Sequence, residues 1–115
     1  MLLFFYMNEL EQKHCVPCEG GALPLMREES AQLLEQTPQW QIAPDGLSLS
    51  REFTFRNFVE AMEFANKITP VAETEGHHPD LAISWGKVIV TLTTHAINGL
   101  SENDFILAAK INKVQ

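Results

Sequence analysis

Three of the four histidines stand in the second half of the chain, at spacings that could support acid–base chemistry. His77 and His78 are adjacent, Glu73 precedes His77 by four residues, and His95 follows further along. Residues four apart share one face of a helix, so Glu73 could hydrogen-bond His77 and decide which ring nitrogen carries the proton. Because histidine ordinarily changes its charge near neutral pH, this group of residues indicates proton transfer.

Two other interpretations of these histidines compete with proton transfer. A histidine is often a surface or structural residue, and His77-His78-Pro79 alone is a weak motif. Three histidines and one glutamate would also satisfy the ligand count of a zinc site. Neighbouring residues on a helix or strand point in different directions, however, which makes His77 and His78 poor joint ligands. We therefore expect no bound metal at this site.

A pair of cysteines with metal-site or redox spacing lies near the start, in the run Cys15-Val16-Pro17-Cys18. Such a pair can be a redox dithiol, half of a zinc site or two thiols in a reducing cytosol. A redox dithiol usually opens a helix, whereas Glu19-Gly20-Gly21 predicts a loop here. A closed zinc site needs four ligands, and only His14 lies nearby. We expect neither a metal nor a redox role.

The region around the cysteines is polar and rich in turn formers, which predicts an extended segment over residues 8–24. We therefore divide the chain into an extended lead-in over residues 1–22 and one folded domain over residues 23–115. A length of 115 residues suits one such domain with a single core.

The first half of the domain predicts a helix followed by a β-hairpin. The helix should run for two to three turns from Leu25 and end before Thr37-Pro38. Apolar and polar residues alternate around Trp40 and again from Leu47 to Phe55, as they do in half-buried strands. Pro44-Asp45-Gly46 between them predicts the turn.

The second half repeats this order with a longer helix. Apolar residues at helical spacing predict a helix that begins after Asn57 and ends near Gly76. Two alternating runs around the Gly86-Lys87 turn predict a second hairpin, in which we expect Trp85 to be packed. A capping box over residues 101–104 predicts the start of a last helix. The order α-β-β-α-β-β-α favours an α+β domain, with a four-stranded antiparallel sheet and helices packed on one face.

The composition excludes several classes of partner. The formal net charge of −7, from 8 basic and 15 acidic residues, would repel phosphate backbones and anionic bilayers. The apolar start, Met1–Met7, has no basic residue before it and no small-residue cleavage site, and no run reaches membrane length. We expect a cytoplasmic protein that binds neither nucleic acid nor membranes.

The spacing of the histidines resembles the signature of the pterin-4a-carbinolamine dehydratase family. After Glu73 come three residues and then His77-His78-Pro79, and the start of the chain resembles bacterial and plant members. Leu81 and Gly76 depart from the pattern of the family, which affects details of the substrate pocket. The remaining positions that carry the likeness are Cys15 to Gly21, Pro24-Leu25, Trp40, Trp85, His95 and Gly99-Leu100-Ser101 with Asp104.

The resemblance implies an enzyme, a hydro-lyase that removes water from 4a-hydroxytetrahydropterin and gives quinonoid dihydropterin. It implies recycling of the pterin cofactor of aromatic amino acid hydroxylases, with no metal or redox cofactor. His77 and His95 would be the acid–base pair, and Glu73 would align His77. The substrate-binding residues would be His78, Pro79 and Asp104.

Asp104 has a second interpretation, as the carboxylate of a capping box that supports the last helix. Two other functions also remain open for the chain as a whole. It could be a protein-interaction module, since animal relatives are dimerisation cofactors of a homeodomain transcription factor, or a metal-dependent hydrolase that uses the same histidines and glutamate. The family also forms homodimers and homotetramers, and an edge strand or the last helix could mediate either.

Overall fold

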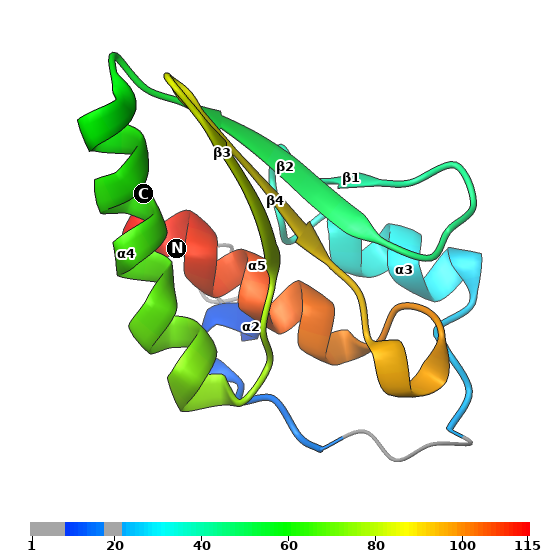
Figure 1. Cartoon of the computed structure of the whole chain (residues 1–115). Helices are drawn as coiled ribbons and strands as arrows, with labels where there is room; N and C mark the ends of the chain where they lie inside the picture. Colours follow the sequence, from blue (N-terminus) through cyan, green and yellow to red (C-terminus); the bar gives the residue numbers. More distant parts are fainter. Residues whose placement is uncertain (1–8, 18–21) are drawn as a thin grey trace, which may run out of the picture.

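The computed structural model describes residues 9–17 and 22–115, so Cys18 and the apolar start Met1–Met7 lie outside the described residues. The helices and strands follow one another in an order that contains the predicted α-β-β-α-β-β-α series (Figure 1). Their bounds are α2 Glu9–Gln12, α3 Arg27–Leu34, β1 Gln41–Ile42, β2 Leu49–Thr54, α4 Phe58–Glu75, β3 Asp80–Ser84, β4 Lys87–Leu92, the 3₁₀ helix η1 His95–Ile97 and α5 Glu102–Val114.

The four strands form one antiparallel sheet in the order β1-β2-β4-β3. Leu49 and Phe53 in β2 and every second residue of β4 are buried on the same face of this sheet, in agreement with the two-residue period of a strand. Phe53 in β2 and Val88 in β4 are directly paired and both buried. The predicted packing of Trp85 is wrong, because it lies in the turn after the edge strand β3 and is 70% exposed.

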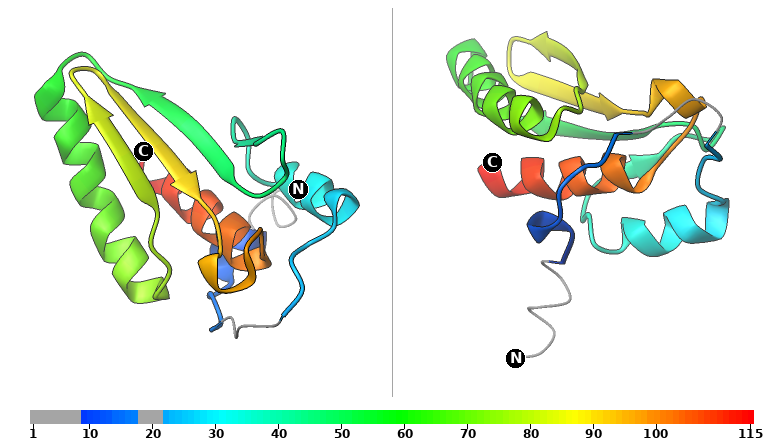
Figure 2. Two further views of the ribbon diagram at one scale, coloured as in Figure 1. Left: turned by 45° about the vertical axis from the view of Figure 1, so that its right-hand side comes forward. Right: turned by 90° about the horizontal axis from the view of Figure 1, so that it is seen from below.

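The helices cover the apolar face of the sheet. Figure 2 shows α5 and α3 on the same side of the strands, with α2 beyond α5. The ring of Phe64 in α4 lies 4.5 Å from that of Phe53, so α4 packs on this face as well. Most of α5 is buried, from Asn103 to Ala109 and at Ile111. The predicted α+β domain, with one antiparallel sheet and helices on one face, is confirmed.

The long helix α4 has the ends that the sequence predicts. The Asn57 side chain accepts a hydrogen bond from the backbone N–H of Glu60, which caps the first turn. Gly76 ends the helix with φ of 63°, a left-handed conformation that glycine adopts without steric cost. The helix therefore ends immediately before His77, which is not part of α4.

The lead-in is not simply extended as predicted, because it contains the helical turn α2. Leu10 in α2 is buried in the core, and α2 packs against α5. The ammonium group of Lys110 in α5 also donates to the backbone carbonyl of Glu11. Burial of one leucine can stabilise about 2 kcal/mol, which explains why a polar segment is held against the domain. In the described part of the chain, no helix is long and apolar enough to cross a membrane.

Candidate active site

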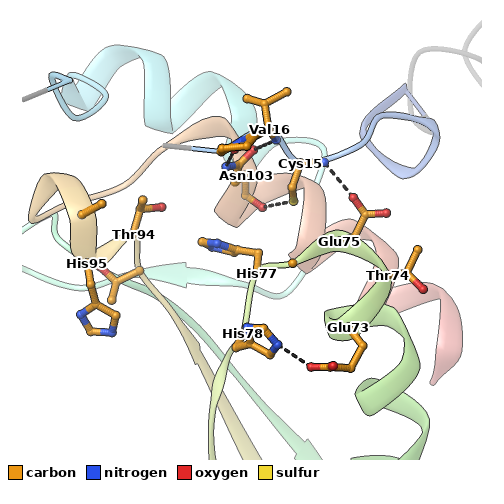
Figure 3. A pocket seen from close by; sticks show the side chains of 14 residues that line it. Cys15, Val16, Glu73, Thr74, Glu75, His77, His78, Thr94, His95 and Asn103 are labelled. Atoms are coloured by element: carbon orange, nitrogen blue, oxygen red, sulfur yellow. Dashed lines mark hydrogen bonds and ion pairs between the residues drawn. The ribbon is translucent and has the colours of Figure 1, made fainter. Parts of the chain in front are cut away.

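A cavity of about 550 Å³ brings together the three histidines of the second half. Its walls come from the C-terminal end of α4, from η1, from the first turn of α5 and from the lead-in. Figure 3 shows His77 and His78 beside the end of α4 and His95 across from them on the left, with the lead-in above. The lining residues are Cys15–Pro17, 73–78, 93–96 and Asn103.

His77 contacts a buried carboxylate behind the cavity wall. Its Nε2 atom lies 2.7 Å from Oδ1 of Asp104, which has no exposed side-chain area. The other carboxylate oxygen, Oδ2, accepts hydrogen bonds from the Thr94 hydroxyl at 2.8 Å and from the Ser101 backbone N–H at 3.0 Å. One oxygen of Asp104 therefore caps α5, as the capping interpretation predicts, and the other contacts His77. His77 lies between Asp104 and the cavity. Asp104 is therefore not a lining residue, whereas a substrate-binding residue would be one.

Glu73 contacts His78, which differs from the predicted contact with His77. The Oε2 atom of Glu73 lies 2.6 Å from Nε2 of His78, and both side chains are largely exposed. The prediction assumed that the helix continues through His77, but Gly76 ends it and turns the following residues away from the helical spacing. An exposed pair of this kind contributes little to stability.

His95 reaches the cavity because β3 and β4 are antiparallel. Asp80 at the start of β3 pairs with Thr91 near the end of β4, which brings the residues after β4 beside those before β3. His95 begins η1 rather than ending a strand, since β4 stops at Leu92. His95 is exposed to solvent. Its ring forms no hydrogen bond with any other described residue. Pro79 is not among the described residues that line the cavity.

These contacts leave nitrogen atoms of the imidazoles available for proton transfer. A carboxylate oxygen accepts a hydrogen bond, so Nε2 of His77 and Nε2 of His78 each carry the proton that they donate. In the neutral form of each ring, Nδ1 then has a lone pair that can accept a proton. In the described part of the chain, no group of three His, Cys, Asp or Glu residues could hold a metal ion.

Several residues that build this site carry no functional signal in the sequence. Thr94 and Glu75 carried no signal, because neither belongs to a recognisable motif. Asn103 lies inside the capping box, where nothing distinguishes it from a surface residue. Cys15–Pro17 contribute to the likeness to bacterial and plant sequences, but the sequence predicts them in a lead-in separate from the folded domain.

Partial burial disfavours ionisation of the Cys15 thiol. It raises the pKa of the thiol to about 12, and the neighbouring Glu75 carboxylate adds to the increase. In a Cys18→Ser variant, where Cys15 is the remaining thiol, we expect iodoacetamide at pH 8 to alkylate it on the order of 10³ more slowly than N-acetylcysteine. Mass spectrometry of timed samples measures the rate, which should rise as the pH approaches 12. Equal rates at pH 8 would contradict this burial.

Known proteins resemble this chain over most of its length. A family model described as pterin 4 alpha carbinolamine dehydratase matches residues 23–114. A relative from Halorhodospira halophila is 48% identical over 103 residues, which are 90% of this chain and 94% of the relative. A relative from Rickettsia canadensis is 54% identical over 106 residues, which are 91% of this chain and 96% of the relative. Both carry the provisional name pterin-4-alpha-carbinolamine dehydratase.

A solved structure shows the same fold. It is a protein from Brucella melitensis described as a transcriptional coactivator/pterin dehydratase, and it superimposes with a TM-score of 0.75 at 32% sequence identity. The superposition covers 79% of this chain and 97% of that protein. The range matched by the family model contains every lining residue of the cavity except Cys15–Pro17.

Proposed function

Because this chain belongs to the pterin-4-alpha-carbinolamine dehydratase family, we propose that it removes water from 4a-hydroxytetrahydropterin and forms quinonoid dihydropterin. Such an enzyme is a hydro-lyase. The observation that carries the proposal is the cavity itself, where three imidazoles meet and one of them is backed by a buried carboxylate.

The reaction requires two proton movements. One proton is delivered to the 4a-hydroxyl group, which leaves as water when the C4a–O bond breaks. The other is removed from N5, and its bonding electrons form the double bond between N5 and C4a. The product keeps the oxidation level of the substrate, so the step needs no oxidant. Positioned acids and bases typically accelerate such proton transfers by ~10²–10⁴-fold.

His77 is suited to accept the proton from N5. Its Nε2–H donates to Asp104, which leaves the lone pair of Nδ1 for the substrate. Once Nδ1 is protonated, the positive imidazolium lies against the Asp104 carboxylate, which stabilises it. Asp104 touches no substrate in this scheme and acts as a positioning residue.

His95 is suited to protonate the departing hydroxyl. Its exposed ring can exchange protons with water between turnovers, and it lies across the cavity from His77. We assign His78 to orientation of the pterin, with its ring held by Glu73. Glu73 thereby acts on substrate orientation rather than on His77.

The same proposal includes the physiological setting. We propose that the enzyme regenerates the pterin cofactor of an aromatic amino acid hydroxylase in the cytoplasm.

The decay of 4a-hydroxytetrahydropterin, followed by absorbance with and without the protein, tests the reaction. Catalytic amounts of protein should accelerate the decay in proportion to their concentration. Enzyme pretreated with a chelator should react at the same rate, because every proposed proton carrier is a side chain. A decay rate equal to that of buffer at all protein concentrations would contradict the proposed activity.

We also propose that two copies of the chain associate through β3. This strand is at the edge of the sheet, and its unpaired backbone groups can pair with a second copy. Leu81 and Ile83 in β3 are 37% and 36% exposed although both belong to the apolar face. The alternative through α5 is unsuitable, because that helix is mostly buried within its own domain.

A charge at this edge should prevent the association. We expect Ile83→Lys to convert the dimer to a monomer, because pairing would bury a lysine. Thr54→Lys is the matched control, since it adds the same charge to an exposed position of the inner strand β2. Size-exclusion chromatography with light scattering measures both masses. A monomeric parent protein, or a dimeric Ile83→Lys variant, would contradict this interface.

A further inference from the structure

We propose that Cys15–Pro17, here called the strap, is a wall of the active site that binds substrate, and that Asn103 is the positioning residue that holds it there. This inference rests on the proposed dehydratase function. It assigns a role in the site to a segment outside the matched range of the family model, which begins at residue 23.

The strap lines the same cavity as the histidines. Cys15, Val16 and Pro17 all contribute to its wall, although they are about sixty residues from His77 in sequence. Figure 3 shows Cys15 and Val16 on the side of the cavity opposite His78. The strap therefore faces the space that the substrate must enter.

Asn103 holds the strap by both backbone groups of one residue. The Val16 N–H donates to Oδ1 of Asn103 at 3.0 Å, and Nδ2 of Asn103 donates to the Val16 carbonyl at 2.6 Å. Only an amide side chain supplies a donor and an acceptor in this arrangement. Asn103 is itself buried, and it immediately precedes Asp104, so the strap and the partner of His77 share one helical turn.

A second anchor joins the strap to the end of α4. The Cys15 N–H donates to Oε1 of Glu75 at 2.7 Å, and the Glu75 side chain is only 3% exposed. Burial alone would raise the pKa of this carboxyl, but the Cys15 N–H, His14 and Lys110 together hold it below its usual value. The buried carboxylate is thus ionised and fully engaged near His77.

The rest of the lead-in is attached without the strap. Leu10 is buried in the core, Lys110 binds the Glu11 carbonyl, and Lys13 pairs with Glu102. The bonds from Asn103 to Val16 are therefore not needed to keep the lead-in on the domain. They determine where the strap lies relative to the cavity.

The chemistry of the strap indicates which part of the substrate it contacts. Val16 and Pro17 are aliphatic, and Val16 is 65% exposed beside the cavity. Because the side chains of Val16 and Pro17 offer no proton donor or acceptor, we expect the strap to contact the apolar surface of the pterin and to take no part in proton transfer. An interaction made equally in substrate and transition state lowers KM and leaves kcat unchanged.

Asn103→Ala tests the positioning role. We expect KM for 4a-hydroxytetrahydropterin to rise about tenfold and kcat to stay within about twofold of the parent. Glu102→Ala is the matched control, because it removes an exposed contact between the lead-in and the same turn of α5 and touches no cavity residue. In a Cys18→Ser background, Asn103→Ala should also make Cys15 alkylation at pH 8 at least about tenfold faster, since the strap is no longer held against α5 and its thiol becomes more exposed.

A second variant tests the strap in case Asn103→Ala does not fold. Val16→Ala alters an exposed side chain of the strap, and we expect an unchanged melting temperature with KM again raised about tenfold. If the parent enzyme is active and both Val16→Ala and Asn103→Ala keep its KM, the strap has no role in binding. Equal KM increases in Glu102→Ala and Asn103→Ala would likewise overturn the inference. An inactive parent would instead contradict the proposed function, while the alkylation rates would still report the position of the strap.

Discussion

His77→Ala and His95→Ala are each expected to reduce dehydratase turnover by about 10²–10⁴-fold while the domain stays folded. Each substitution removes one of the two proposed proton carriers from the cavity wall. The variant that lacks both imidazoles should be slower than either single variant. Steady-state kinetics give the turnover, and circular dichroism with thermal melts shows whether the fold is kept.

The chain offers a control of the same residue type. His14→Ala removes an imidazole that is exposed and lies outside the lining of the cavity, so turnover should stay within about twofold of the parent. His78→Ala should act mainly on KM, because we assign that ring to orientation of the pterin. Parent-like turnover by both His77→Ala and His95→Ala, with native circular dichroism, would show that the assigned acid–base pair is wrong.

Asp104→Asn should lower turnover by about 10²–10⁴-fold with little loss of stability. The carbonyl oxygen of the new amide can still accept from Ser101 and Thr94, so its NH₂ group must face His77. Nε2 of His77 then becomes the acceptor, and the ring proton moves to Nδ1. That tautomer has no lone pair available for N5, and the positive imidazolium loses its carboxylate.

Stability distinguishes the two duties of Asp104. We expect Asp104→Asn to lower the free energy of unfolding by about 1 kcal/mol, and Asp104→Ala by about 3 kcal/mol. The alanine leaves the Ser101 N–H and His77 without their buried carboxylate and removes one of the two hydrogen-bond partners of the Thr94 hydroxyl. Urea unfolding followed by fluorescence measures both values. An Asp104→Asn variant with parent-like turnover would limit Asp104 to capping α5.

Local signals in the sequence account for most of the fold. Asn57 and Gly76 mark the ends of α4 because side-chain capping and left-handed glycine act within one helical turn. Alternating apolar residues predict β2, β3 and β4, because one face of the sheet is buried. The predicted packing of Trp85 is wrong because burial at that position depends on distant neighbours. The alternating pattern does not reveal that β3 lies at the edge of the sheet.

The helical turn α2 was missed for a related reason. A polar stretch of four residues has little tendency to form a helix by itself. Burial of Leu10 against α5 supplies the stabilisation, and this contact joins segments at opposite ends of the sequence. Local composition therefore predicted an extended segment where tertiary packing forms a turn of helix.

The sequence by itself predicted that Glu73, His77, His78 and His95 come together, and the resemblance added Asp104 to this group. Only the tertiary structure decided which of these residues contact one another. Asp104 rather than Glu73 binds His77, and Asn103 brings Val16 to the cavity from the other end of the chain. The physical reason is that a hydrogen bond requires its two atoms about 3 Å apart, and the packing of α4, α5 and the lead-in decides which atoms meet at that distance.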